Sequence, residues 1–270
     1  VKQPDLAQTL TAISEKGADA FYQGPIADAL INDMQTRKGI ISKSDLQDYK
    51  IRYRTPLVGS YRGHAIVSSP PPSSGGQIIL SLLNVMEQSP ATSGYRSVEN
   101  LHLYIEANKR VFADRALLGD PDYLSYLPGL LPHLIAKDRG PLLAQTISTQ
   151  ATPSKEIAPG QGSALPADVP REPGASHSAG MDTTHLSVVD KDGNAVAMTT
   201  TVNYSWGSCI AAKGTGIIWN DEMDDFAAAP GVPNAYGIVG SHANAVEPGK
   251  VPLSSMSPTF VFQTDSVQSP

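Results

Sequence analysis

The sequence lacks the residues that hold together small secreted proteins or zinc sites: among its 270 residues there is a single cysteine, Cys209. One cysteine excludes an internal disulfide framework and a zinc site made of several cysteines. The sequence also has no apolar run long enough to cross a membrane as a helix, and no basic run of the kind that binds nucleic acid. The formal net charge is −6 and 17% of the residues are charged, which is typical of a globular protein without a nucleic-acid partner.

The first third of the sequence has the pattern of short helices. Apolar residues recur at helical spacing between Pro4 and Gly17, and again in the stretch 24–39, which begins with Gly-Pro and ends at a glycine. Ser44 is expected to cap a further short helix that ends near Tyr49. Because this helical pattern starts with the first residues, we expect the sequence to be a segment of something longer.

A β-like stretch over 52–69 is followed by two longer helix patterns. The first opens after Ser-Ser-Gly-Gly and is interpreted as a buried helix, although a helix N-terminus after glycines can also hold an anion. The second runs from Ser97 to Leu118, and short helices are expected to continue to about Gln145. One broad face of this helix is predicted to carry Leu101, Tyr104, Ile105, Asn108, Val111 and Phe112.

After a stretch rich in Pro, Gly, Ser and Ala, the apolar residues alternate with a period of two, as in strands. "THLSVV" and "AVAMTTTV" flank "DKDGN", which predicts a β-hairpin. A second β-rich stretch is expected at "GTGIIWN", and a turn leading into a strand at "VPLSSMSPTFVFQ". Helices first and strands afterwards favour an α+β fold over alternating βαβ units.

The length of the hairpin loop decides which threonine faces which. If residues 191–193 form a three-residue loop, Thr183 lies opposite Thr201; a two-residue loop places Thr184 there instead. Opposed Cβ atoms lie about 4.5–5.5 Å apart, within reach of a hydrogen bond between hydroxyls. Asn203, two residues beyond Thr201, is then expected on the same face. Alternatively, these are ordinary cross-strand pairs, because threonine favours strands.

A threonine hydroxyl is a poor nucleophile unless a general base takes its proton. If the chain is cut after Asp182, Thr183 gains an α-amino group, whose ordinary pKa of about 7.7–8.0 suits it to that task. His185 is the alternative base. It lies two residues along the same strand, where an imidazole aligns poorly with the hydroxyl, so we interpret it as structural.

Five blocks of the sequence closely resemble the γ-glutamyltranspeptidase family. They are "RTPLVGSYRGHAIVSSPPPSSGG", "ANKRVFADRALLGDPDY", "DTTHLSVVDKDGNAVAMTTTVN", "NDEMDDFAAAPGVPNAYGIVG" and "KVPLSSMSPT". The resemblance runs in order over nearly the whole chain.

The resemblance implies an N-terminal-nucleophile hydrolase of the α+β class, a four-layer αββα sandwich made from a precursor that cuts itself into two subunits. Residues 1–146 would be the mainly helical C-terminal part of the large subunit. Residues 147–182 would form a flexible linker that ends at the cleavage site, and residues 183–270 the β-rich N-terminal part of the small, catalytic subunit. The present segment would therefore hold only part of the sandwich.

The resemblance also implies an activity and its partners. Family members cleave the γ-glutamyl amide of glutathione and related compounds, and pass the acyl group to water or to an amino acid or peptide amine. The two subunits form a heterodimer, and no cofactor or metal is expected. Bacterial relatives are mostly periplasmic or secreted, which is the location the resemblance implies for a bacterial protein.

Roles at single positions follow from the same resemblance. Thr183 is the expected nucleophile and new N-terminus, with the cut between Asp182 and Thr183, and Thr201 is expected to position it. Tyr236 matches the aromatic residue of a loop that covers the pocket.

The remaining positions are expected to hold the substrate. A γ-glutamyl group ends in an ammonium and a carboxylate, which acidic side chains and hydroxyls can bind respectively. Taken without the resemblance, "DEMDD" would be a solvated acidic turn and "LSSMSP" ordinary turn chemistry before a strand. The expected substrate-binding residues are Asn203, Glu222, Asp225, Ser254 and Ser255.

Two family features do not appear within these residues: an upstream arginine that pairs with the substrate carboxylate, and a downstream Gly-Ser-Pro-Gly-Gly-type turn whose N–H groups bind the oxyanion. Loss of one oxyanion donor typically costs about 10²–10³ in rate, so the segment alone is expected to be a poor catalyst. Two alternatives remain open, a glutaryl- or cephalosporin-type acylase of the same superfamily and a truncated, non-catalytic module.

Overall fold

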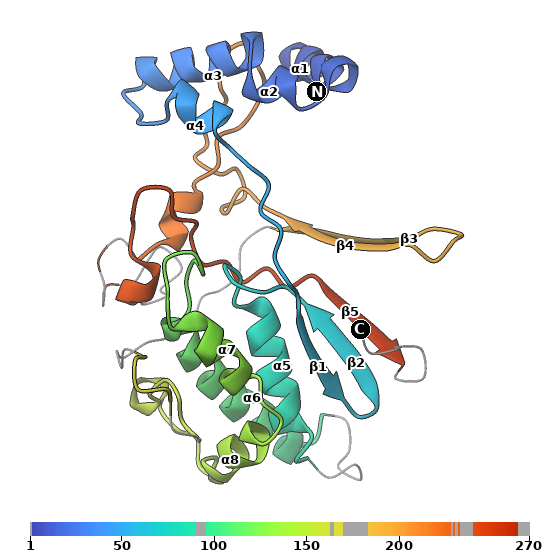
Figure 1. The fold of residues 1–270 in the computed structure, drawn as a ribbon, viewed down its shortest axis with the longest axis vertical. Coiled ribbons are helices and arrows are strands. Elements are labelled where there is room, and N and C mark those ends of the chain that lie inside the picture. Colours follow the sequence, from blue (N-terminus) through green and yellow to red (C-terminus); the bar gives the residue numbers. More distant parts are fainter. Residues whose placement is uncertain are drawn as a thin grey trace. The chain divides into compact units, whose positions relative to one another are not determined.

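The computed structural model of the chain describes residues 2–89, 96–162, 165–169, 183–227, 229, 232 and 240–263. The described residues form two compact units (Figure 1). The first unit contains residues 2–54, 183 and 201–221, and the second contains the remaining described residues. The two units are described one at a time.

The first unit is built on four short helices, α1 (Pro4–Lys16), α2 (Asp19–Tyr22), α3 (Pro25–Thr36) and α4 (Lys43–Gln47). The expected helices 4–17 and 24–39 are confirmed. The cap of α4 is Ser42 and not Ser44, because the backbone N–H and the hydroxyl of Ser42 both lie 2.7 Å from the Asp45 carboxylate.

The segment 201–221 is fastened to these helices although it lies far along the sequence. The Thr9 hydroxyl in α1 donates to the Thr215 carbonyl at 2.8 Å. Asp33 in α3 accepts from Arg37 at 2.9 Å and from the Trp219 indole at 3.4 Å. These hydrogen bonds lower the pKa of Asp33, and the bond from Arg37 has the largest effect. The expected β-rich stretch at "GTGIIWN" forms no full strand, but it pairs with residues 208–212 through an isolated bridge between Ala211 and Ile218 and through backbone hydrogen bonds of Ile217 and Trp219.

A three-stranded antiparallel sheet forms the base of the second unit. Its strands are β1 (Leu57–Tyr61), β2 (His64–Ser68) and β5 (Thr259–Gln263), in the order β1-β2-β5. Helix α5 (Gly75–Met86) lies along this sheet (Figure 1). Gly59 allows the close approach, since a Cβ there would lie 2.7 Å from Leu80.

Further helices cover α5 and complete the core of the second unit. They are α6 (Val98–Ala113), the 3₁₀ turn η1 (Asp114–Leu117), α7 (Leu127–Leu134) and α8 (Arg139–Gln145). One buried apolar cluster joins α5, α6 and α8 and includes Val85, Val111 and Leu143. As the sequence predicts, α5 is buried over most of its length.

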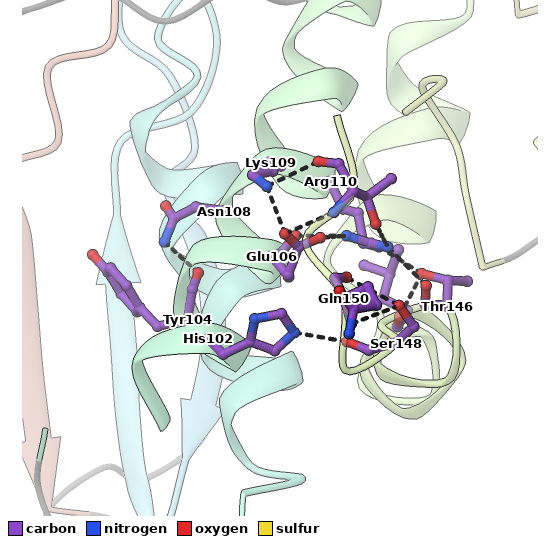
Figure 2. Close-up of polar contacts among 11 residues, drawn as sticks. His102, Tyr104, Glu106, Asn108, Lys109, Arg110, Thr146, Ser148 and Gln150 are labelled. Carbon is purple, nitrogen blue, oxygen red and sulfur yellow. Dashed lines mark hydrogen bonds and ion pairs between the residues drawn. The ribbon is translucent and has the colours of Figure 1, made fainter. Parts of the chain in front are cut away.

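The buried face of α6 agrees with the predicted face only in part: Val111 is buried and Phe112 packs against the core, as expected. Leu101, Tyr104 and Ile105 are about half exposed, whereas Glu106 and Arg110 are buried. Figure 2 shows the reason: the Glu106 carboxylate binds Arg110 at 2.8 Å and Lys109 at 2.5 Å. Burial alone would raise the pKa of Glu106, but the hydrogen bonds from Lys109, Arg110 and Thr152 hold it at about 2.

These buried charges also fasten the stretch that follows α8. Arg110 binds the hydroxyl and the carbonyl of Thr146 at 2.6 and 2.7 Å, and the Thr152 backbone N–H donates to Glu106 at 3.2 Å. A second buried ion pair joins Asp114 to Arg139 at 2.8 Å. This pair binds the backbone of residues 160 and 161.

Part of the predicted linker 147–182 is therefore hydrogen-bonded to the helices of the second unit. Besides these hydrogen bonds, it contains the 3₁₀ turn η2 (Ser154–Glu156) and the buried Ile157 and Val169. Residues 170–182 lie outside the described part.

The second unit also contains the hairpin β3 (Thr184–Val189) and β4 (Ala195–Thr200) and the 3₁₀ turns η3 (Glu222–Asp225) and η4 (His242–Asn244). The observed elements agree with the predicted α+β class, and the expected turn leading into the last strand is confirmed at β5. Among the helices that the structure describes, none is both long and apolar enough to traverse a bilayer.

Candidate active site

The β3–β4 hairpin has the register that places Thr183 beside Thr201. Thr184 pairs with Thr200 at the open end of the hairpin, so Thr183 and Thr201 meet one step further on. The Thr183 hydroxyl donates to the Thr201 hydroxyl at 3.2 Å. The three-residue loop is thus confirmed over the two-residue alternative, as is the expected contact between the two hydroxyls.

Asp190 fixes this register from the loop. Its backbone N–H donates to the Asn194 carbonyl at 2.9 Å. Its carboxylate accepts from the Asn194 side chain at 2.7 Å and from the backbone N–H groups of Asn194 and Asp192 at 2.9 Å. These bonds, led by that of the Asn194 side chain, lower the pKa of Asp190. Gly193 takes the left-handed conformation, with φ of 84°, that closes the loop.

His185 is held along the hairpin by hydroxyls. Its Nδ1 lies 2.8 Å from the Thr199 hydroxyl and its Nε2 lies 3.1 Å from the Ser187 hydroxyl. Both ring nitrogens therefore have partners within the hairpin, which favours the structural interpretation of His185 over a role as general base.

Asn203 reaches Thr201 by a route that differs from the predicted one. Strand β4 ends at Thr200, and Asn203 has a φ of 76°, so it does not continue the strand face. Its backbone N–H donates to the Thr201 hydroxyl at 3.0 Å, while its amide donates to the Asp221 carbonyl at 3.2 Å. The Thr201 oxygen thus has two donors, Thr183 and the Asn203 backbone, which fix its place beside Thr183.

Glu222 and Asp225 are the ends of the turn η3, which we call the acidic turn, residues 222–225. Both are half-buried, and buried Phe226 follows. Arg115, which is only 8% exposed, interacts with this turn through its charge. Burial lowers the pKa of Arg115, and the negative charge of Asp225 opposes that change.

Ser254 and Ser255, which we call the serine pair, lie at the N-terminus of α5. The Ser254 backbone N–H donates to the Pro72 carbonyl at 2.8 Å, and the Ser74 backbone N–H and hydroxyl donate to the Ser254 carbonyl at 2.9 and 3.0 Å. Gly75 permits this approach, because a Cβ there would lie 2.6 Å from the Met256 carbonyl oxygen. The positive end of the α5 dipole favours a carboxylate near these hydroxyls.

The expected site residues thus fall into separate groups. Thr183, Thr201 and Asn203 come together in the first unit. The acidic turn and the serine pair belong to the second unit. Asp182 and Tyr236 lie outside the described residues. Within the described part of the chain, no group of three His, Cys, Asp or Glu side chains is placed to hold a metal ion.

Solved structures with the same arrangement of elements define the class of fold. A crystal structure of a cephalosporin acylase from Bacillus halodurans matches 98% of this chain and 42% of that chain, with a TM-score of 0.78 and 24% identity. A crystal structure of a γ-glutamyltranspeptidase from Helicobacter pylori matches 58% of this chain and 45% of that chain, with a TM-score of 0.56 and 43% identity. The fold is that of the N-terminal-nucleophile hydrolases.

The sequence itself decides the family. The family model of gamma-glutamyltranspeptidase matches residues 1–270. A glutathione hydrolase proenzyme from Pseudomonas sp. (strain A14) is 46% identical over 262 residues, which are 96% of this chain and 43% of the relative. The chain therefore belongs to the γ-glutamyltranspeptidase family, and it spans less than half the length of this relative.

Proposed function

We propose that the protein containing this chain is a γ-glutamyltransferase and glutathione hydrolase that cuts itself before Thr183. The contact of 3.2 Å between the hydroxyls of Thr183 and Thr201 carries the proposal. In the uncut chain Thr183 has no α-amino group, and a threonine hydroxyl needs a base. Scission supplies that base on the same residue, while Thr201 keeps the nucleophile oriented.

The proposed reaction proceeds through an acyl-enzyme. The Thr183 hydroxyl attacks the γ-glutamyl amide, its proton passes through the α-amino group to the leaving amine, and an ester forms. Water or the amine of an amino acid or peptide then attacks the ester, which regenerates the threonine. In this scheme the acidic turn binds the substrate ammonium and the serine pair binds its carboxylate, and Asn203 is a further substrate-binding residue by the same resemblance.

The alternative is an acylase that acts on glutaryl amides. The cephalosporin acylase shares the fold, but at 24% identity it supports nothing more specific. A glutaryl group has no α-amino group, so it gives Glu222 and Asp225 nothing cationic to bind. The acidic turn therefore favours a γ-glutamyl substrate.

The maturation test uses the protein expressed from its complete coding sequence. Mass spectrometry should find a fragment that begins at Thr183, and Thr183→Ala should abolish both this fragment and turnover of γ-glutamyl-p-nitroanilide. Thr184→Ala is the matched control, a threonine one residue further along the chain, and a protein with this change should still cut itself. A precursor that never yields the fragment supports the non-catalytic module, and faster turnover of glutaryl-p-nitroanilide supports the acylase.

Two further proposals rest on the same resemblance. After the cut, the fragments before and after Thr183 remain together as a heterodimer, which co-purification through a tag on one fragment tests. For a bacterial host we propose a periplasmic or secreted location, and recovery of the activity only in the cytoplasmic fraction would refute it.

A further inference from the structure

A buried asparagine, Asn244, joins the two segments to which the proposed function assigns the substrate. Its Nδ2 donates to the Asp225 carbonyl at 2.6 Å, and its Oδ1 accepts from the Leu253 backbone N–H at 2.9 Å. Asp225 is the last residue of the acidic turn, and Leu253 immediately precedes the serine pair. Asn244 is 4% exposed, so one buried amide spans the gap between the two segments.

The backbone of Asn244 is itself fixed. Its carbonyl accepts from the Ala227 N–H at 2.9 Å, just past the acidic turn. The preceding residues pack tightly on the segment after α6: the Ser241 hydroxyl donates to the Ala116 carbonyl, and a Cβ on Gly119 would lie 2.2 Å from the Ala243 carbonyl oxygen. Hydrogen bonds and close packing therefore fix the backbone that carries the amide.

Arg115 also interacts with both of these segments. Its Nη2 donates to the Leu253 carbonyl at 2.9 Å, and its positive charge interacts favourably with Asp225. Leu253 thus has its N–H bound by Asn244 and its carbonyl bound by Arg115. Asp225 of the acidic turn and Leu253, which precedes the serine pair, are thus connected twice: by the two hydrogen bonds of Asn244, and by Arg115 through one hydrogen bond to Leu253 and a charge interaction with Asp225.

We propose that Asn244 is a positioning residue that sets the separation between the acidic turn and the serine pair, and thereby selects substrates that carry both an ammonium and a carboxylate. The inference rests on the proposed function, because it takes these two segments as the binding groups for the two ends of a γ-glutamyl group. Only a side chain with a donor and an acceptor can make both bonds. Aspartate has no donor for the Asp225 carbonyl, and serine is too short to bridge.

The proposal makes a prediction about selectivity that loss of stability does not share. A γ-glutamyl substrate must engage both segments at once, so it is sensitive to their separation. A glutaryl substrate has only the carboxylate and engages the serine pair alone. Lower stability reduces the amount of active enzyme, which lowers the rates with both substrates by the same factor.

The experiment compares kcat/KM for γ-glutamyl- and glutaryl-p-nitroanilide in the complete, matured protein. For Asn244→Asp the ratio of the two values should fall about 10- to 100-fold, the range for losing a hydrogen bond to a charged group. The fall should appear mainly in KM for the γ-glutamyl substrate. Asn244→Ser introduces no charge, should lower the ratio in the same direction, and provides the measurement if the aspartate variant does not fold.

Asn84→Asp is the matched control. Asn84 is also 4% exposed and its Nδ2 also donates to a carbonyl, that of Ile135 at 2.9 Å, but it lies on α5 and contacts neither substrate segment. It should leave the ratio unchanged. An unchanged ratio in both Asn244 variants, or an equal fall in the control, would overturn the inference. A wild-type protein that does not turn over the γ-glutamyl substrate would instead overturn the proposed function.

Discussion

Acid should destabilise the second unit through Glu106. Burial alone would raise the pKa of this carboxyl, but bonds from Lys109, Arg110 and Thr152 lower it from 4.5 to about 2. At about 1.4 kcal/mol for each pH unit, the difference amounts to about 3 kcal/mol of free energy of unfolding. Because the folded-state pKa is the lower one, this stabilisation is complete above pH 4.5 and is lost as the pH falls towards 2.

The substitution Glu106→Gln tests this origin. At pH 7 it removes the carboxylate and leaves the Arg110 guanidinium buried without its partner, so the free energy of unfolding should fall by about 3–5 kcal/mol. Urea denaturation followed by circular dichroism, repeated from pH 7 to pH 3, measures the loss. The difference in free energy of unfolding between the wild-type and variant proteins should decrease steadily below pH 4.5.

Glu87→Gln is the control for a carboxylate in a partly exposed pair. Glu87 binds Lys137 at 2.8 Å, with exposed fractions of 26% and 43% for the two side chains. Its loss should cost less than about 1 kcal/mol at pH 7. The loss of free energy of unfolding in Glu106→Gln could instead stay constant from pH 7 to pH 3, or equal the loss in the control. Either result would show that the buried charge of Glu106 does not provide the stabilisation.

Three further changes test other contacts. Thr201→Val removes the hydroxyl that Thr183 contacts and should slow self-cleavage about 5- to 10-fold in a gel time course; an unaltered rate contradicts the positioning role. Gly75→Ala places a Cβ 2.6 Å from the Met256 carbonyl oxygen and should cost about 1–3 kcal/mol in thermal denaturation, so an unchanged midpoint contradicts the close approach. Asp190→Ala should speed amide hydrogen exchange in the hairpin; wild-type protection would show that the loop fixes itself without this carboxylate.

The hairpin could be predicted because its information is local. Alternating apolar residues on both sides of Asp-Gly determine the two strands, and the period of two leaves only the loop length undecided. Asp190 settles that length with hydrogen bonds that span four residues. The contact between Thr183 and Thr201 follows directly.

The burial of Glu106 and Arg110 on α6 could not be predicted, because it depends on residues far along the sequence. A pattern of apolar residues places Leu101 and Ile105 inside and charged residues outside. In the structure Glu106 and Arg110 are inside because they neutralise each other and because Thr146 and Thr152, some forty residues further along, complete their hydrogen bonds. The sequence pattern of the helix alone does not indicate that Thr146 and Thr152 are the partners of these charges.

Asn244 and Arg115 were missed for the same reason. "SHANAV" has the composition of any small-residue loop, and the arginine follows a long amphipathic pattern without interrupting it. Their importance lies in bonds to Asp225 and Leu253, which the fold alone brings to them. A buried polar residue between two predicted binding segments is recognisable only in three dimensions.

If the protein cuts itself before Thr183 as proposed, the anchoring of the stretch after α8 has a consequence for the fragment that precedes the cut. Buried Val169 belongs to the same apolar cluster as Leu130 and Leu134, so the new carboxyl terminus would be linked through the chain to a residue held in that core. Residues 170–182 span at most about 45 Å when fully stretched, at about 3.3–3.6 Å per residue. The new carboxylate would therefore remain tethered to the molecule from which it was cut. Its effective concentration near that molecule would be set by the length of the tether, and dilution of the protein would not lower it.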